Sequence, residues 1–315
     1  MRRVSQIARR LLRHKKRKEA LLSASLEDLM SQRQYVSYLQ HPLRKVSFSS
    51  QSGDIKSAFK GRGMELEEIR PYSFGDDVRD IDWRVTARKQ KPYTRLFAEE
   101  RDREVYAVVD LSEKMRFGTK AELKSVSACK IMALLGWLAL ENKDRFGGMI
   151  FDGRQNLMFK AQNHRAGLLA MLKKVSDVSR DILKNEADTS SFSKTLLILS
   201  QNIKQNAVVF VVSDFVSSDE TLQKSLALLA AKCDVFCLDV CDVVELYPPK
   251  AGVYMVENKQ EQLVFDTTDP QFCEDYQKMF YQKRKIFEDF CRRFSCRYRQ
   301  IRTDKSLFKQ MQNGV

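Results

Sequence analysis

Histidine, proline and tryptophan are scarce in this chain, and its longest apolar run is too short to cross a membrane. Of 315 residues, three are histidine, six are proline and two are tryptophan. The apolar run at 131–140 has about half of the roughly 20 residues that a transmembrane helix needs, so we expect a buried helix there. The first residues lack the apolar core that precedes a signal-peptide cleavage site. A cytoplasmic protein is therefore expected.

The chain also lacks the short motifs of nucleotide-binding and nucleophilic enzymes. It contains no G-x-G-x-x-G, no G-x-x-x-x-G-K-[ST] and no G-x-S-x-G. His14, His41 and His164 are far apart and away from the cysteines, which disfavours a zinc site. The seven cysteines include no C-x-x-C pair, which indicates reduced thiols. We therefore expect a protein that is not an enzyme.

The net charge of +14 is concentrated in two segments of the chain. Residues 1–20 carry nine Lys or Arg against one Glu, and residues 276–309 carry eleven against three acidic residues, so each segment has a charge of +8. The rest of the chain has a net charge of −2. A nearly neutral body with two basic patches is expected.

The first basic segment has apolar residues at helical spacing, including Val4, Ile7 and Leu11. A basic amphipathic helix can bind an anionic membrane surface or an acidic partner. Such a helix can also dock its apolar stripe on its own domain, or be a frayed tail. The sequence leaves these alternatives open.

The second basic segment mixes cations with aromatic residues, as some nucleic-acid-binding proteins do. Its phenylalanines recur at helical spacing, which favours a core-facing stripe with a solvated basic face: Phe280, Phe287, Phe290 and Phe294. Nucleic acid is therefore not the expected partner.

From residue 105 onward, short apolar runs alternate with helical patterns. Continuously apolar strands alternating with helices predict an α/β fold, a doubly wound and mostly parallel sheet with helices on both faces. We expect three parts: a basic N-terminal helical extension (1–46), a β-rich segment (47–104) and the α/β domain (105–315).

Oxygen-bearing side chains follow two of the predicted strands. Asp110 and Ser112 end the first strand, Ser213 and Asp214 end a later one, and Thr189 lies in a loop. Because parallel sheets bind ligands at the carboxyl ends of their strands, we expect these residues to lie together. Mg²⁺ prefers such carboxylate and hydroxyl ligands, although Asp and Ser also cap helices.

A long block of the sequence resembles the family called domain of unknown function 58. Residues 61–115 contain GRGME, then R-x-Y-x-x-GDD-x-R-x-IDW-x-x-x-AR, then a strand ending in D-x-S. Further agreement lies at 143–153, 211–215 and 240–252, and the resemblance covers roughly 30–310. It implies a von Willebrand factor A-like fold with an N-terminal helical and β extension. It also implies association with AAA+ ATPases of the MoxR type, as adaptor or co-chaperone.

The resemblance further implies a metal-ion-dependent adhesion site with the pattern D-x-S-x-S, then Thr, then Asp. Asp110 and Ser112 match the first two ligands, Asp214 the last, and Thr189 loosely the third. Lys114 stands where the second serine belongs, and a charged ammonium has no lone pair for a cation. We therefore expect a degenerate site with no ion, or with a weakly held Mg²⁺.

The segment 73–88 interleaves acidic and basic residues around Trp83. The near one-to-one supply of opposite charges predicts an ion-pair network that holds an irregular segment, with Trp83 packed beneath it. The alternatives are an interface that reports conformation, or carboxylates that act as catalytic groups or metal ligands. The residues of this network are Asp76, Asp77, Asp80, Asp82, Arg79, Arg84 and Arg88.

These observations predict a non-enzymatic interaction module that binds partners through its strand-end face. The expected partner-binding residues are Asp110, Ser112, Lys114, Thr189 and Asp214, with Lys114 in the ion's role. One alternative is a Mg²⁺-dependent hydrolase that uses Asp110 and Asp214. Another is a peripheral binder of anionic membranes or nucleic acid that acts through its first 20 residues.

Overall fold

The structure, a computed structural model, describes seven stretches of the chain. They are 21–39, 64–74, 76–99, 103–182, 190–216, 218–257 and 262–312. The chain forms two compact units, and the described residues of the smaller one lie within 64–99. The basic segment at 1–20 and Thr189 lie outside the described residues.

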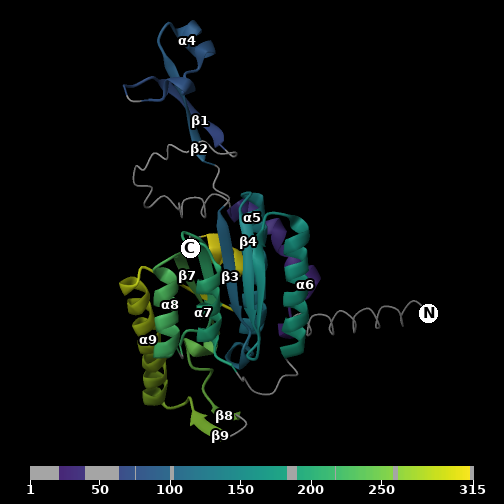
Figure 1. The fold of residues 1–315 in the computed structure, drawn as a ribbon. Coiled ribbons are helices and arrows are strands. Elements are labelled where there is room, and N and C mark those ends of the chain that lie inside the picture. Colours follow the sequence, from purple (N-terminus) through teal and green to yellow (C-terminus); the bar gives the residue numbers. More distant parts are fainter. Residues whose placement is uncertain are drawn as a thin grey trace, which may run out of the picture. The chain divides into compact units, whose positions relative to one another are not determined.

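The larger unit is built on a six-stranded sheet (Figure 1). Its strands run in the order β10-β7-β6-β3-β4-β5, and each neighbouring pair is parallel except β4 and β5. The expected doubly wound, mostly parallel sheet is confirmed. The strands are β3 (Glu104–Asp110), β4 (Arg145–Phe151), β5 (Asn156–Gln162), β6 (Val208–Ser213), β7 (Asp234–Cys241) and β10 (Arg297–Arg302).

Helices cover both faces of this sheet (Figure 1). Residues of β3 alternate between two cores: Val105, Ala107 and Val109 face one, and Tyr106 and Val108 face the other. The first core takes side chains from α2 (Leu26–Ser31), η1 (Gln32–Tyr35), α5 (Lys124–Glu141), α6 (Arg165–Asp181) and α10 (Leu307–Gln312) or their flanks. The second takes them from α7 (Phe192–Asn202), α8 (Glu220–Ala230) and α9 (Pro270–Arg293).

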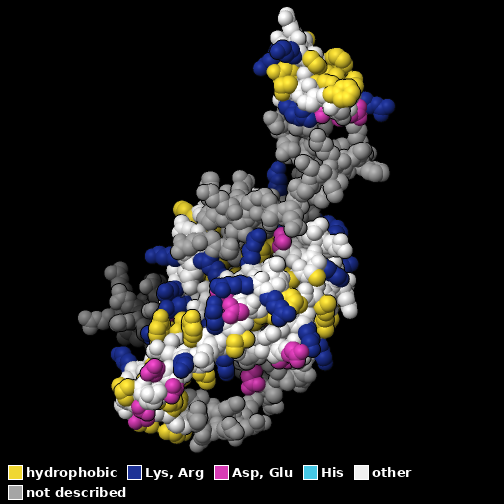
Figure 2. Space-filling view, turned by 90° about the vertical axis from the view of Figure 1, so that its left-hand side faces the viewer, with side chains coloured by type: hydrophobic (Ala, Val, Ile, Leu, Met, Phe, Trp, Pro, Cys, Tyr) yellow, Lys and Arg dark blue, Asp and Glu magenta, His cyan; other side chains and the backbone are white. Residues whose placement is uncertain are grey.

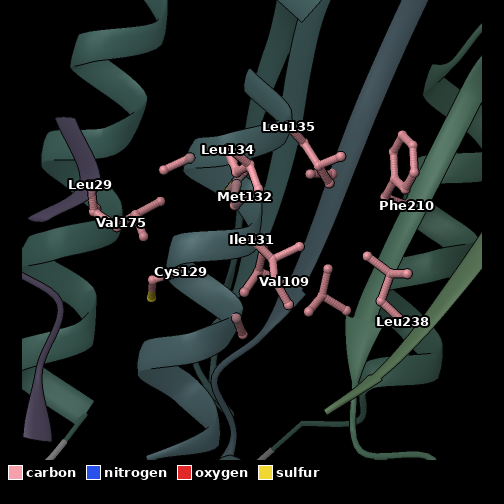
Figure 3. Close-up of a cluster of buried hydrophobic side chains, with 14 of the residues drawn as sticks. Leu29, Val109, Cys129, Ile131, Met132, Leu134, Leu135, Val175, Phe210 and Leu238 are labelled. Atoms are coloured by element: carbon pink, nitrogen blue, oxygen red, sulfur yellow. The ribbon is translucent and has the colours of Figure 1, made fainter. Parts of the chain in front are cut away.

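Helix α5 is buried on nearly all sides, as the apolar run at 131–140 predicts. Figure 3 shows its side chains between the sheet residues Val109 and Leu238 on one side and Leu29 of α2 and Val175 of α6 on the other. The described part of the N-terminal extension thus belongs to this core. None of the helices in the described stretches has the length and apolar character to span a bilayer.

Two further elements lie between β7 and β10 in the chain. Strands β8 (Val253–Glu257) and β9 (Gln262–Asp266) form an antiparallel hairpin. In the basic segment that follows, Phe287 is buried, Phe280 is half-buried, and Phe290 packs against the second core. Phe294 is 37% exposed, so its predicted core position is wrong. It caps the C-terminal end of α9, where Ser295 turns the chain with a φ of 56°.

The smaller unit contains the antiparallel pair β1 (Met64–Pro71) and β2 (Tyr93–Glu99), with η2 (Val78–Asp80) and α4 (Trp83–Lys89) between them. Ion pairs link Asp76 to Arg70 at 2.7 Å and Asp82 to Arg95 at 3.6 Å. Trp83 is 66% exposed, so its predicted burial is wrong. Carboxylates of this segment cap the starts of η2 and α4, and they do not cover the indole.

The burial of Leu29 gives a direct test of the N-terminal packing. Leu29 is fully buried, whereas its neighbour Met30 is 37% exposed. Leu29→Ala should lower the free energy of unfolding by about 3 kcal/mol, because it leaves a cavity between α2 and α5. Met30→Ala should change it by less than about 0.5 kcal/mol. Urea denaturation measures both, and equal effects would contradict this packing.

Candidate functional site

The candidate site lies where the strand order of the sheet reverses. Strands β3 and β6 are neighbours in the sheet, and the chain leaves them toward opposite sides. The carboxyl ends of such strands form the crevice in which open α/β sheets bind ligands. Asp110 is the last residue of β3, and Asp214 directly follows β6. Asp110 and Asp214 therefore both lie at the carboxyl ends of their strands, as the sequence predicts.

Asp110 is completely buried, and other groups satisfy its carboxylate. Its Oδ1 accepts a hydrogen bond from the backbone N–H of Ser112 at 2.9 Å. Its Oδ2 accepts one from the hydroxyl of Ser213 at 2.6 Å. These bonds fix the loop that leads into the short helix η3 (Glu113–Met115), which carries Lys114.

Lys114 bridges the two strand ends. Its Nζ lies 3.2 Å from Asp110 Oδ2 and donates a hydrogen bond to the backbone carbonyl of Asp214 at 2.9 Å. It also lies 5.8 Å from the centre of the Phe192 ring. The side chain is 28% exposed, whereas those of Asp110 and Lys124 are buried. The structure thus brings together Asp110, Ser112, Lys114 and Asp214.

A second lysine, which the sequence analysis missed, lies behind the first. Lys124 is 2% exposed, and its Nζ lies 2.6 Å from both Asp214 Oδ2 and Glu245 Oε1. It is the first residue of α5, where the helix dipole disfavours a cation. The sequence does contain a signal for this pairing, because a lysine at the start of an apolar helix needs carboxylate partners when it is buried.

The network of charged side chains continues from Glu245 toward β10, an outer strand of the sheet. Arg284 of α9 contacts Glu245 at 3.4 Å and Asp239 of β7 at 3.3 Å. Asp239 also accepts a hydrogen bond from the hydroxyl of Tyr298 at 2.7 Å. Glu245, Arg284 and Tyr298 in turn line a groove of about 610 Å³ beside α9. Buried charges therefore connect the strand-end face to this groove.

Burial and pairing pull the pKa values of these groups in opposite directions. Burial raises the pKa of the Asp214 carboxyl, but the charge and hydrogen bond of Lys124 outweigh it and hold that pKa below its ordinary value. Burial lowers the pKa of Lys124, but Asp214 and Glu245 outweigh it, so the net shift is upward. For Glu245 burial prevails over Lys124, and its pKa is raised.

A divalent ion does not fit this site, because the two lysine ammonium groups already contact the carboxylate oxygens that would be its ligands. Mg²⁺ needs oxygen atoms with free lone pairs in a near-octahedral arrangement. Here Asp110 Oδ2 faces the ammonium of Lys114, and Asp214 Oδ2 accepts a bond from Lys124. Within the described stretches, no group of three or more His, Cys, Asp or Glu residues forms a metal centre. The expected Mg²⁺ stays a prediction that this arrangement does not favour.

The chain belongs to the family described as "Protein of unknown function DUF58", whose match covers residues 68–286. Among curated proteins, the uncharacterized protein Rv1480 of Mycobacterium tuberculosis is 26% identical over 225 residues, which cover 71% of this chain and 70% of that protein. The uncharacterized protein Mb1516 of Mycobacterium bovis matches with the same values.

Solved structures give more distant similarities. BatB from Bacteroides thetaiotaomicron is 13% identical, with a TM-score of 0.40 over 67% of this chain and 95% of that chain. The SpRpn10 VWA domain is 12% identical, with a TM-score of 0.33 over 68% and 98%. The fold assignment rests on the strand order described above.

The pairing of Lys124 makes stability depend on pH in a defined way. Lys124→Met should lower the free energy of unfolding by about 3–5 kcal/mol at pH 7, because buried Asp214 loses the cation that pairs with its carboxylate and Glu245 keeps only Arg284. The depressed pKa of Asp214 stabilises the parent above the ordinary Asp range, and this stabilisation is lost as the pH falls. In Lys124→Met the pKa values of the Asp214 and Glu245 carboxyls rise. The destabilisation therefore disappears once these carboxyls are protonated.

The difference between parent and variant should therefore shrink as the pH falls from 7 toward 4, as measured by urea denaturation at each pH. Lys224→Met is the matched control, because Lys224 pairs with Glu220 on an exposed surface at 2.8 Å. Because solvent screens this exposed pair, the control should unfold as the parent does at every pH. A Lys124→Met penalty that does not vary with pH would contradict the charge network.

Proposed function

We propose that this protein is a non-enzymatic interaction module that binds an acidic side chain of a partner protein at its strand-end face. In this proposal the ammonium of Lys114 takes the place of a metal ion. A partner carboxylate that would complete the coordination of an ion instead pairs with the lysine.

The position of Lys114 is the observation that carries the proposal. Its ammonium bridges Asp110 Oδ2 and the Asp214 carbonyl, and the side chain as a whole is 28% exposed. An ammonium has three donor hydrogens, so one remains for an incoming carboxylate after these two contacts. The surrounding protein has already fixed the side chain, which reduces the entropy that binding must overcome.

The buried pairing of Lys124 supports a binding role and not a catalytic one. It neutralises Asp214, which would be the second carboxylate of a Mg²⁺-dependent hydrolase. Asp110 is in turn held by Ser112, Ser213 and Lys114. A general base needs a free lone pair within reach of its substrate, and these carboxylates are engaged.

The partner in this proposal is an AAA+ ATPase of the MoxR type, for which the protein acts as adaptor or co-chaperone in the cytoplasm. The sequence resemblance suggests this partner, and the strand-end face suggests the mode of contact. An acidic residue on the ATPase, or on a protein that the pair handles, is the chemical complement of Lys114.

Affinity capture with the full chain as bait tests this function, with a MoxR-type ATPase of the source organism quantified by mass spectrometry. Lys114→Glu should reduce its capture by at least about tenfold, because it places like charges opposite each other. EDTA in the wash should leave capture unchanged. Lys224→Glu, a charge reversal at a 70% exposed site on α8, should bind as the parent does.

Three results would contradict the proposal. Loss of capture in EDTA would indicate an ion at the site. Unchanged capture by Lys114→Glu would remove the lysine from the interface. Failure of the parent to capture any MoxR-type ATPase would remove this partner.

A further inference from the structure

The smaller unit exposes three large apolar side chains within a short stretch of sequence. Phe74 is fully exposed, Trp83 is 66% exposed and Val78 is 59% exposed. We call these three residues the aromatic tip. Figure 2 shows the hydrophobic side chains of this unit gathered together, with both basic and acidic side chains beside them. An exposed apolar cluster of this kind marks an interaction surface more often than a single exposed residue does.

Local structure holds the aromatic tip in this position. Asp76 accepts hydrogen bonds from the backbone N–H of Ser73 at 2.9 Å and from Arg70 at 2.7 Å, which fixes the turn that carries Phe74. Asp82 caps α4 and thereby places Trp83 at the first position of that helix. A hydrogen-bonded turn therefore holds Phe74 in its exposed position, and a capped helix start holds Trp83.

The segment that carries the aromatic tip is positively charged, although the unit as described, 64–99, is nearly neutral at −1. Residues 70–95 contain seven Lys or Arg and four Asp, which gives +3. Asp77 and Asp82 accept hydrogen bonds from backbone N–H groups at the starts of η2 and α4, so their charge is partly satisfied within the unit. The exposed cations of the segment are Arg79, Arg84, Arg88, Lys89 and Lys91.

Tryptophan and phenylalanine with neighbouring Lys and Arg are the residues that anchor proteins at a membrane interface. The aromatic rings enter the boundary between headgroups and acyl chains, and the cations pair with anionic phosphates. A fluid interface accepts protruding side chains without a preformed pocket, whereas a protein partner must offer one. The full exposure of Phe74 therefore favours a membrane surface.

We propose that the aromatic tip inserts into the interface of an anionic membrane. Phe74 and Trp83 bury their rings among the lipids, and Arg79 and Arg84 bind the headgroup phosphates. This contact is independent of the strand-end site, so either can fail without the other. A single weak anchor gives reversible attachment, which suits a protein that also has to meet a soluble partner.

The experiment measures binding of the full chain to vesicles of two parts phosphatidylcholine to one part phosphatidylglycerol, and to phosphatidylcholine alone. We expect binding to the anionic vesicles that weakens as salt is added. Phe74→Ser with Trp83→Ser should lower the partition coefficient by at least about tenfold, because two aromatic side chains lose their apolar environment. Arg79→Gln with Arg84→Gln should lower it by roughly tenfold.

Tryptophan fluorescence locates the contact. The chain has two tryptophans, and Trp137 is 4% exposed in the core, so brominated lipids should quench Trp83 alone. Trp83→Phe should keep the partition coefficient within about threefold and lose the quenching, because the apolar ring remains. Leu228→Ser, which removes a 56% exposed apolar side chain from α8, is the matched control and should bind as the parent does.

Several results would overturn the proposal. One is a parent chain that does not bind the anionic vesicles. Another is a Phe74→Ser, Trp83→Ser variant that binds as the parent does, which would place the membrane contact elsewhere, for example in residues 1–20. A third is a vesicle-free protein in which aqueous acrylamide does not quench Trp83, because the tip would then be covered by this chain or by a second copy.

Discussion

The buried ammonium of Lys124 is the interaction on which the strand-end face depends. Parallel strands bring several carboxylates to one edge of the sheet, and burial without a cation would be costly for each of them. Lys124 contacts both Asp214 and Glu245 at 2.6 Å, so one buried cation satisfies two of these groups. The apolar helix α5 supplies this cation from its first turn, which couples the core to the site.

From Lys124 the contacts extend in two directions. Through Asp214 they reach Lys114, whose side chain is partly exposed. Through Glu245 they reach Arg284, which lines the groove beside α9. Because each charged side chain is held by the next, the charges of this face are fixed within the chain itself. Rigid preorganised charges of this kind give specificity in binding, which is the basis of the function proposed above.

The sheet and part of the site could be predicted from the sequence, because both depend on local patterns. Apolar strands ending in Asp110 and Asp214 indicate where a parallel sheet presents its carboxyl ends. The partners of Lys124 could not be predicted, since they lie 90 and 121 residues away and meet it only in the folded chain. Trp83 was misplaced for a related reason: alternating charges suggest an ion-pair network over the indole, whereas Asp77 and Asp82 cap helix starts, and the ion pair of Asp82 is with Arg95 of β2.

The central claim is that lysine ammonium groups occupy the place of a metal ion at the strand ends. A crystal structure from crystals soaked in Mn²⁺, with anomalous diffraction recorded at a wavelength where manganese scatters strongly, tests it most directly. The account predicts no anomalous peak within coordination distance of Asp110, and density for the Lys114 ammonium between Asp110 and the Asp214 carbonyl. A manganese peak coordinated by Asp110 and Ser112, with Lys114 turned away, would contradict it.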